Sequence, residues 1–206
     1  YLALKARDLL YTSGKIESFE ADVPTICIGG ITAGGTGKTP MVELMVRMLA
    51  EERRVAVLSR GYKGSNKGFH IVEAEDPASL VGDEPLQIKR KYPRITVAVD
   101  RNRREGVESL QTLLDAPDLI VLDDGFQRRD IIPAKNILLI DYNRPIFSDE
   151  LLPLGRLRDL PEQIERADTV IFTKCPLYLT ESGKQQLKEE NHLLPGPKVF
   201  FTSVDY

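Results

Sequence analysis

Eight residues near the N-terminal end of the chain combine glycines with a lysine and a threonine in a pattern that binds phosphate. They are Thr32, Ala33, Gly34, Gly35, Thr36, Gly37, Lys38 and Thr39. A strand-like apolar segment (23–31) precedes them and a helix-like segment (41–52) follows. In this context the glycines let several backbone N–H groups point into one concavity, and the helix adds its positive end. We therefore expect ATP or a similar triphosphate here, with Lys38 on its phosphates and the Thr39 hydroxyl on Mg²⁺.

The match to the general phosphate-loop pattern has one departure. That pattern begins with a glycine five residues before the glycine of the Gly-Lys pair, and Thr32 stands in that place. The alternative is an ordinary glycine turn at the start of a helix. Lysine and threonine directly after Gly37 favour the phosphate loop, because turn chemistry alone gives no reason for that pair.

Composition describes an ordinary globular chain. It has 206 residues, 42% of them hydrophobic and 29% charged, with a net charge of −3. A small negative net charge does not favour a nucleic-acid partner. Cys27 and Cys175 stand in apolar segments without metal-ligand spacing, and no signal peptide or membrane-length apolar run is present. Because the chain starts at Tyr1 and stops just after a strand-like segment (198–204), we expect a piece of a longer protein.

Continuous apolar runs alternate with helical patterns along the chain. The runs cover residues 25–28, 55–58, 95–99, 119–122, 137–140, 169–172 and 199–202. Such runs are typical of strands covered on both faces. The pattern predicts an α/β fold of the P-loop NTPase kind, a mostly parallel sheet with helices on both faces. Residues 1–22 form a basic amphipathic helix and linker, in contact with a membrane or packed on the domain, and residues 23–206 form the main domain.

Polar residues follow several of the expected strands, at the edge where parallel α/β sheets bind their ligands. They are Ser59 with Arg60, Asp100, Asp123 and Asp124 with Gln127, and Asp141. Residues 119–123, four apolar residues and a carboxylate, have the form of a Walker B strand that binds Mg²⁺ directly or through water. The alternative for Asp-Asp-Gly is a plain turn. Asp100 could accept a proton from an attacking hydroxyl or cap the helix that starts near Arg103.

Several motifs together resemble one family. Besides the phosphate loop they are Ser-Arg-Gly-Tyr at 59–62, Gly-Asp-Glu-Pro at 82–85, Asp-Asp-Gly-Phe-Gln at 123–127 and Leu-Pro-Leu-Gly-Arg-Leu-Arg at 152–158. In this order, over about residues 23–176, the chain resembles tetraacyldisaccharide 4'-kinase, the ATP-dependent kinase of lipid A synthesis. Thr32 at the first loop position agrees with that family.

The resemblance implies a reaction and a place in the cell. The reaction is transfer of the ATP γ-phosphate to the 4'-hydroxyl of a tetraacylated glucosamine disaccharide. The enzyme would be peripheral, on the cytoplasmic face of the bacterial inner membrane, with residues 23–206 as an incomplete kinase domain. The family also uses a histidine in its C-terminal part, and His192 lies too early for that role.

The resemblance and the strand ends together give a set of expected site residues. Lys38, Asp100, Asp123 and Arg158 are expected to be catalytic; Thr39, Asp123, Asp124 and Gln127 to hold Mg²⁺; and Arg60 and Asp159 to bind the acceptor. The family more often has Glu where Asp159 stands. Two other classes stay open: a partitioning or septum-site ATPase switch, whose signature lysine would fall on Ala33, and a ligase like dethiobiotin synthetase.

Overall fold

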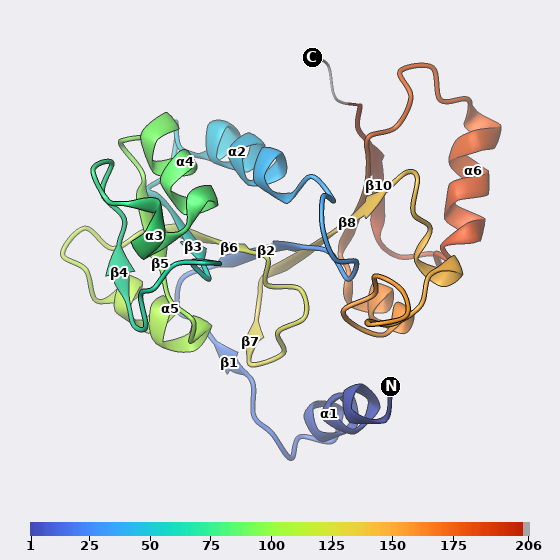
Figure 1. Ribbon diagram of the computed structural model, residues 1–206, viewed down its shortest axis with the longest axis horizontal. Helices are drawn as coiled ribbons and strands as arrows, with labels where there is room; N and C mark the ends of the chain where they lie inside the picture. Colours follow the sequence, from blue (N-terminus) through green and yellow to red (C-terminus); the bar gives the residue numbers. More distant parts are fainter. Residues whose placement is uncertain (204–206) are drawn as a thin grey trace.

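A computed structural model describes residues 1–203 of the chain (Figure 1). Residues 204–206, the end of the domain expected over 23–206, lie outside the described residues. The strands are β1 (Phe19–Glu20), β2 (Thr25–Gly29), β3 (Val55–Ser59), β4 (His70–Ile71), β5 (Thr96–Val99), β6 (Leu119–Asp123), β7 (Ile131–Ile132), β8 (Lys135–Asp141), β9 (Thr169–Thr173) and β10 (Lys198–Phe201). The helices are α1 (Leu2–Thr12), α2 (Lys38–Leu49), α3 (Ala78–Val81), α4 (Asp83–Lys91), α5 (Arg103–Gln111) and α6 (Glu181–Glu190), with 3₁₀ turns η1 (Ile146–Ser148) and η2 (Pro161–Arg166).

In the described chain, eight strands form the main sheet in the order β10-β9-β8-β2-β6-β3-β5-β4. All neighbours are parallel except β4, which runs antiparallel to β5. β2 lies in the middle, between β6 and β8. The loop after β2 therefore opens at the carboxyl edge of the sheet, with the ends of two neighbouring strands beside it.

Alternate residues of the central strands face two different apolar cores. Ile28 belongs to a core with Met41, Val42 and Val46 of α2, and Cys27 to a core with Val107 and Leu110 of α5. Figure 1 shows α2 and α4 on one side of the sheet and α5 on the other. The predicted fold, a mostly parallel sheet with helices on both faces, is confirmed.

The helix after the phosphate loop starts earlier than the apolar pattern indicates. α2 runs from Lys38 to Leu49, whereas periodicity placed it at 41–52. Gly37 has φ 81°, in the left-handed region, and turns the chain directly into the helix. Apolar periodicity begins only at Met41 because Lys38, Thr39 and Pro40 precede the first buried residue of α2.

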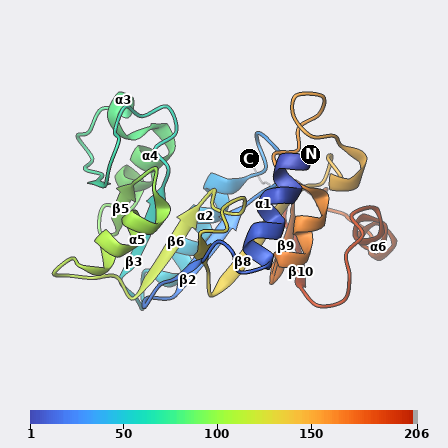
Figure 2. The same ribbon diagram turned by 90° about the horizontal axis from the view of Figure 1, so that it is seen from below.

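α1 lies outside the layers that cover the main sheet, below them in Figure 1 and toward the viewer in Figure 2. Each of its residues is at least partly exposed, and β1, which pairs with β7, follows it. Within residues 1–203 the structure has no helix long and apolar enough to cross a membrane. The division into residues 1–22 and 23–206 stays a prediction.

Candidate phosphate-binding and catalytic site

The phosphate loop is fixed at both ends and open in the middle. Ala33 donates its N–H to the carbonyl of Arg156 over 2.7 Å, and the Thr173 hydroxyl donates to the carbonyl of Thr36 over 3.0 Å. Gly34 and Gly35 are exposed, with positive φ. The side-chain oxygen of Thr36 is buried without a hydrogen-bond partner among residues 1–203. Together with the uncapped N-terminus of α2, this makes a concavity suited to an anion.

Lys38, Asp124 and Arg158 meet at the mouth of this loop. Arg158 donates from both terminal nitrogens to Asp124, over 2.9 and 2.8 Å, and also to the carbonyl of Gly30 over 2.9 Å. Lys38 Nζ lies 3.7 Å from Asp124 Oδ1. Two fixed cations and one carboxylate are thus held where the phosphates of a bound nucleotide would end.

The adjacent carboxylates Asp123 and Asp124 have opposite pKa shifts. Burial raises the pKa of Asp123, and the neighbouring Asp124 charge raises it further. Burial alone would also raise the pKa of Asp124, but its hydrogen bond to Arg158 and the charge of Lys38 bring the pKa below its ordinary value. Asp123 accepts a hydrogen bond from the Ser59 hydroxyl over 3.1 Å. The two carboxylates therefore differ in environment although they adjoin in sequence.

Asp100 lies at the end of β5 and is 2% exposed. Its Oδ1 accepts the backbone N–H of Asn102 over 2.8 Å, and its Oδ2 is buried without a partner in the described part of the chain. Asn102, not Asp100, caps α5 by accepting from Glu105, so the helix-cap alternative for Asp100 is wrong. Because this oxygen is buried, a ligand hydroxyl reaches it only if the surrounding chain moves.

Buried Arg103 ties the Asp100 strand end to the Asp123 strand end. Its guanidinium donates to the carbonyl of Asp100 over 3.0 Å and to the carbonyl of Asp123 over 2.6 Å. Burial lowers its pKa to about 10. Sequence pattern placed Arg103 after the Asp100 strand but gave it no role, because only the strand order brings the Asp100 and Asp123 strand ends within its reach.

The remaining expected residues lie apart from one another. Arg60 is exposed after β3. The Gln127 amide donates to the carbonyl of Gly30, beside the phosphate loop. Asp159 is 1% exposed and pairs with Arg7 of α1 over 2.8 Å. This places the Asp159 carboxylate under α1 rather than on an open surface, and its role in acceptor binding stays a prediction.

Sequence reasoning missed Lys174, which follows β9. Its Nζ pairs with Asp141 Oδ2 over 2.7 Å. Although burial opposes the shift, this hydrogen bond holds the pKa of Asp141 below its usual range. Lys174 and Thr173 line a hollow of about 550 Å³ together with the phosphate loop. The rule that polar residues follow ligand-bearing strands would have found both residues if it had been applied to the run 169–172.

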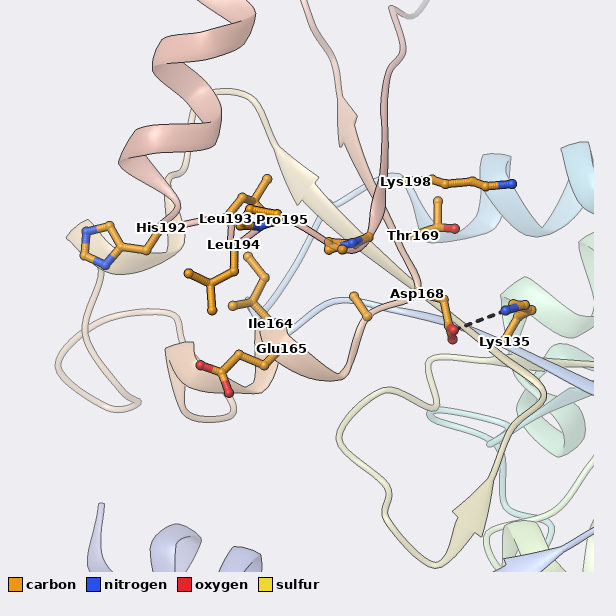
Figure 3. A pocket seen from close by; sticks show the side chains of 13 residues that line it. Lys135, Ile164, Glu165, Asp168, Thr169, His192, Leu193, Leu194, Pro195 and Lys198 are labelled. Atoms are coloured by element: carbon orange, nitrogen blue, oxygen red, sulfur yellow. Dashed lines mark hydrogen bonds and ion pairs between the residues drawn. The ribbon is translucent and has the colours of Figure 1, made fainter.

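Another hollow, of about 540 Å³, lies at the opposite edge of the sheet, where β9 and β10 begin. Figure 3 shows the Asp168–Lys135 ion pair at one end of it and Leu193, Leu194 and Pro195 toward the other. Because the polar strand ends, the phosphate loop and the Lys38–Asp124–Arg158 cluster all lie at the other edge, we place the functional site there.

Comparison with known proteins identifies the family of the chain. A family model described as LpxK, tetraacyldisaccharide-1-P 4'-kinase, matches residues 1–198. Curated relatives named tetraacyldisaccharide 4'-kinase include one from Phocaeicola vulgatus, 44% identical over 97% of this chain and 55% of its own length. Another, from Porphyromonas gingivalis, is 45% identical over 100% of this chain and 58% of its own length. The chain thus spans little more than half the length of these relatives.

Solved structures give the same result at the level of the fold. The "apo" form of LpxK from Aquifex aeolicus in complex with ATP is 32% identical, covers 97% of this chain and 60% of its own, and has a TM-score of 0.82. The hydrogenase maturation factor HypB from Archaeoglobus fulgidus, at 15% identity, covers 98% of this chain and 88% of its own with a TM-score of 0.54, and shows a shared fold alone. With its phosphate loop, its strand-end carboxylates and a family match over residues 1–198, the chain belongs to the tetraacyldisaccharide-1-P 4'-kinase family.

Proposed function

We propose that the protein containing this chain transfers the γ-phosphate of ATP to the 4'-hydroxyl of a tetraacylated glucosamine disaccharide, a lipid A precursor. The observation that carries the proposal is the Lys38–Asp124–Arg158 cluster at the mouth of a glycine-rich loop. The relatives' names support the acceptor, and the ATP in the Aquifex aeolicus structure supports the donor. The family match over residues 1–198 favours this reading over the ATPase switch and the ligase.

Positioning and charge neutralisation carry most of phosphoryl transfer, and this chain offers both. The loop N–H groups and Lys38 hold the β- and γ-phosphates of ATP, and Arg158 neutralises charge that develops on the transferred group. Asp100 takes the acceptor hydroxyl at its free Oδ2 and accepts the proton as the new bond forms. Arg60, exposed after β3, is a further candidate for contact with the acceptor.

Mg²⁺ fits the oxygen donors near the loop. Among residues 1–203 no group of three His, Cys, Asp or Glu residues could hold a metal ion unaided. Mg²⁺ commonly uses one or two protein oxygens together with phosphate oxygens and waters, so a site of that kind does not need three. The Thr39 hydroxyl and the carboxylates of Asp123 and Asp124 are suitable hard oxygen donors, and Gln127 adjoins them. Bound Mg²⁺ would neutralise charge on the β- and γ-phosphates.

A lipid acceptor requires access to a membrane surface, and α1 offers one. Leu2 and Leu9 of α1 are 81% and 68% exposed. These two side chains, seven residues apart, lie on one side of α1, and no residue of α1 is buried. We place this face on the cytoplasmic side of the bacterial inner membrane.

The test is phosphoryl transfer by the whole protein in detergent, with labelled ATP, Mg²⁺ and a tetraacyl disaccharide. Lys38→Ala is expected to lower kcat/KM by at least about 10²-fold, because it removes a cation aimed at developing phosphate charge. Lys188→Ala in α6 is the control for a lost lysine and should behave like the parent. Transfer that survives Lys38→Ala undiminished contradicts the proposal. ATP hydrolysis without acceptor would favour the ATPase switch.

A further inference from the structure

We propose that Arg7 of α1 and Asp159 are positioning residues that hold Arg158 in place. Through this pair α1 stabilises the catalytic cluster of Lys38, Asp124 and Arg158, and we call this support the brace. The inference rests on the proposed kinase function for its activity readout. Asp159 then acts through its neighbour in sequence rather than by touching the acceptor.

α1 meets the rest of the protein through charged and polar side chains. Arg7 Nη2 lies 2.8 Å from Asp159 Oδ2, and Asp8 Oδ1 accepts from the Gln163 amide over 3.0 Å. Asp8 also pairs with Arg129. Since every residue of α1 is at least partly exposed, these contacts, rather than a buried apolar face, hold the helix in place.

The partners of α1 belong to the two segments that carry the catalytic cluster. Arg129 ends the segment 123–129, which begins with Asp123 and Asp124. Asp159 and Gln163 belong to the segment 158–163, which begins with Arg158. α1 thus contacts both segments that carry the bidentate Arg158–Asp124 pair.

A second arginine joins the same two segments. Arg166 donates to the carbonyl of Phe126 over 3.0 Å and to Gln163 Oε1 over 3.1 Å. Gln163 is therefore the point where the contact from α1 and the contact from Arg166 meet. α1 is thereby connected through side-chain contacts to both segments, 123–129 and 158–163.

The Arg7–Asp159 pair is the member of this network that acts most directly on Arg158. Asp159 is 1% exposed, so its carboxylate needs a charged partner, and Arg7 supplies it. Arg158 itself is fixed by the hydrogen bond from its N–H to the carbonyl of Ile31, over 2.7 Å. If Arg7 is lost, the uncompensated Asp159 charge moves toward water. That movement turns the adjoining Arg158 and weakens a bond that depends on two parallel contacts.

The decisive experiment is a double-mutant cycle of Arg7→Ala and Arg158→Ala in the whole protein. Arg7→Ala is expected to lower kcat/KM for ATP about tenfold, the scale at which supporting partners of a site usually act. The same change made in the Arg158→Ala protein should lower kcat/KM for ATP little further than Arg158→Ala does alone. Arg7→Lys, which keeps the charge without the fork, should recover part of the loss. Lys5→Ala, also in α1 and also the loss of one cation, is the control.

The same double-mutant cycle is measured a second time with MgATP affinity, by calorimetry without acceptor. This readout does not need transfer activity. A parent that binds MgATP but phosphorylates no acceptor refutes the kinase proposal and leaves the brace testable. The brace is overturned if Arg7→Ala matches the parent in both readouts, or if the two losses are additive.

Asp159→Asn, with its similar side-chain size, provides the second variant in case Arg7→Ala folds poorly. A rise in the acceptor KM alone would show that Asp159 touches the acceptor and would also overturn the brace. A fall in kcat/KM for ATP with the acceptor KM unchanged supports it.

Discussion

At the scale of residues, one pair of neighbours shows how environment divides two identical side chains. Asp123 is 8% exposed and accepts from a hydroxyl, whereas Asp124 accepts two charged hydrogen bonds from Arg158. The pKa of the first is raised and the pKa of the second is lowered. Asp124 has φ 52°, a left-handed conformation that aims its carboxylate at the cations. The pair is therefore one buried acid with a costly charge and one half-buried, compensated anion.

The raised pKa of Asp123 predicts a stabilising substitution. The folded state binds the Asp123 proton more tightly than the unfolded state. This group therefore lowers the free energy of unfolding as pH rises above its pKa in the unfolded state, about 3.9. Asp123→Asn should therefore raise the free energy of unfolding at pH 7, while the gain disappears near pH 3. Urea unfolding at both pH values measures this difference. Activity should fall in the same variant if the carboxylate serves Mg²⁺.

Asp141→Asn is the counterpart with the opposite sign. Its lowered pKa means that the folded state holds the Asp141 proton less tightly, so the carboxylate contributes stability above about pH 3.9 that is lost as pH falls through its folded pKa. This variant should be less stable than the parent at pH 7 and approach it in acid. Equal pH profiles for the two Asn variants would contradict both assignments.

Asp100→Asn separates a role in acceptor chemistry from one in nucleotide binding. Asparagine keeps an oxygen for the Asn102 N–H but cannot accept the proton, so kcat with lipid acceptor should fall by about 10²-fold or more. MgATP affinity should stay at the parent value, because Asp100 follows β5 rather than the loop after β2. If ATP affinity collapses while the bound fraction turns over normally, Asp100 belongs to the nucleotide site.

At the scale of elements, sequence pattern located the strands and missed how α1 is attached. The run 119–122 became β6 (Leu119–Asp123) and 169–172 became β9 (Thr169–Thr173), because an apolar run buried on both faces is itself the signal. The Arg7–Asp159 pair could not be predicted this way. Both residues are polar, they stand far apart in sequence, and only the completed fold brings them into contact.

The entry into α2 depends on one glycine, and a second glycine offers a matched control. Gly37 and Gly14 have φ of 81° and 71°, and an added Cβ would meet only ordinary contacts at Gly37 and open space at Gly14. Alanine at either position should cost about 1–2 kcal/mol through backbone strain alone. Only Gly37→Ala should also weaken MgATP affinity, by tenfold or more, because it displaces the loop amides. Thermal unfolding and calorimetry together test this expectation. Equal ATP affinity in the two variants would refute it.

At the scale of the whole molecule, the two edges of the sheet carry different features. The carboxyl edge collects the phosphate loop, the carboxylates and Arg158, and the amino edge carries the hollow of Figure 3. Sequence pattern predicted the carboxyl edge as the site because polar residues follow several of the expected strands. It could not give the strand order, and so could not tell that Asp123 and Asp141 flank the loop on opposite sides, while two strands separate the Asp100 strand from the strand before the loop.

The central place of β2 also dictates when the phosphate loop can take shape during synthesis. β2 pairs with β6 and β8, neither of which is its neighbour along the chain. A ribosome adding about 5–20 residues per second needs on the order of ten seconds between the two sides of the first of these pairs. For that time the apolar residues of β2 have no strand to pair with. Ribosome-bound chains that stop before Leu119 should therefore be cleaved readily by protease at the loop, and chains in which β8 has emerged should resist. Early protection of the loop in the shorter chains would show that it folds without its sheet.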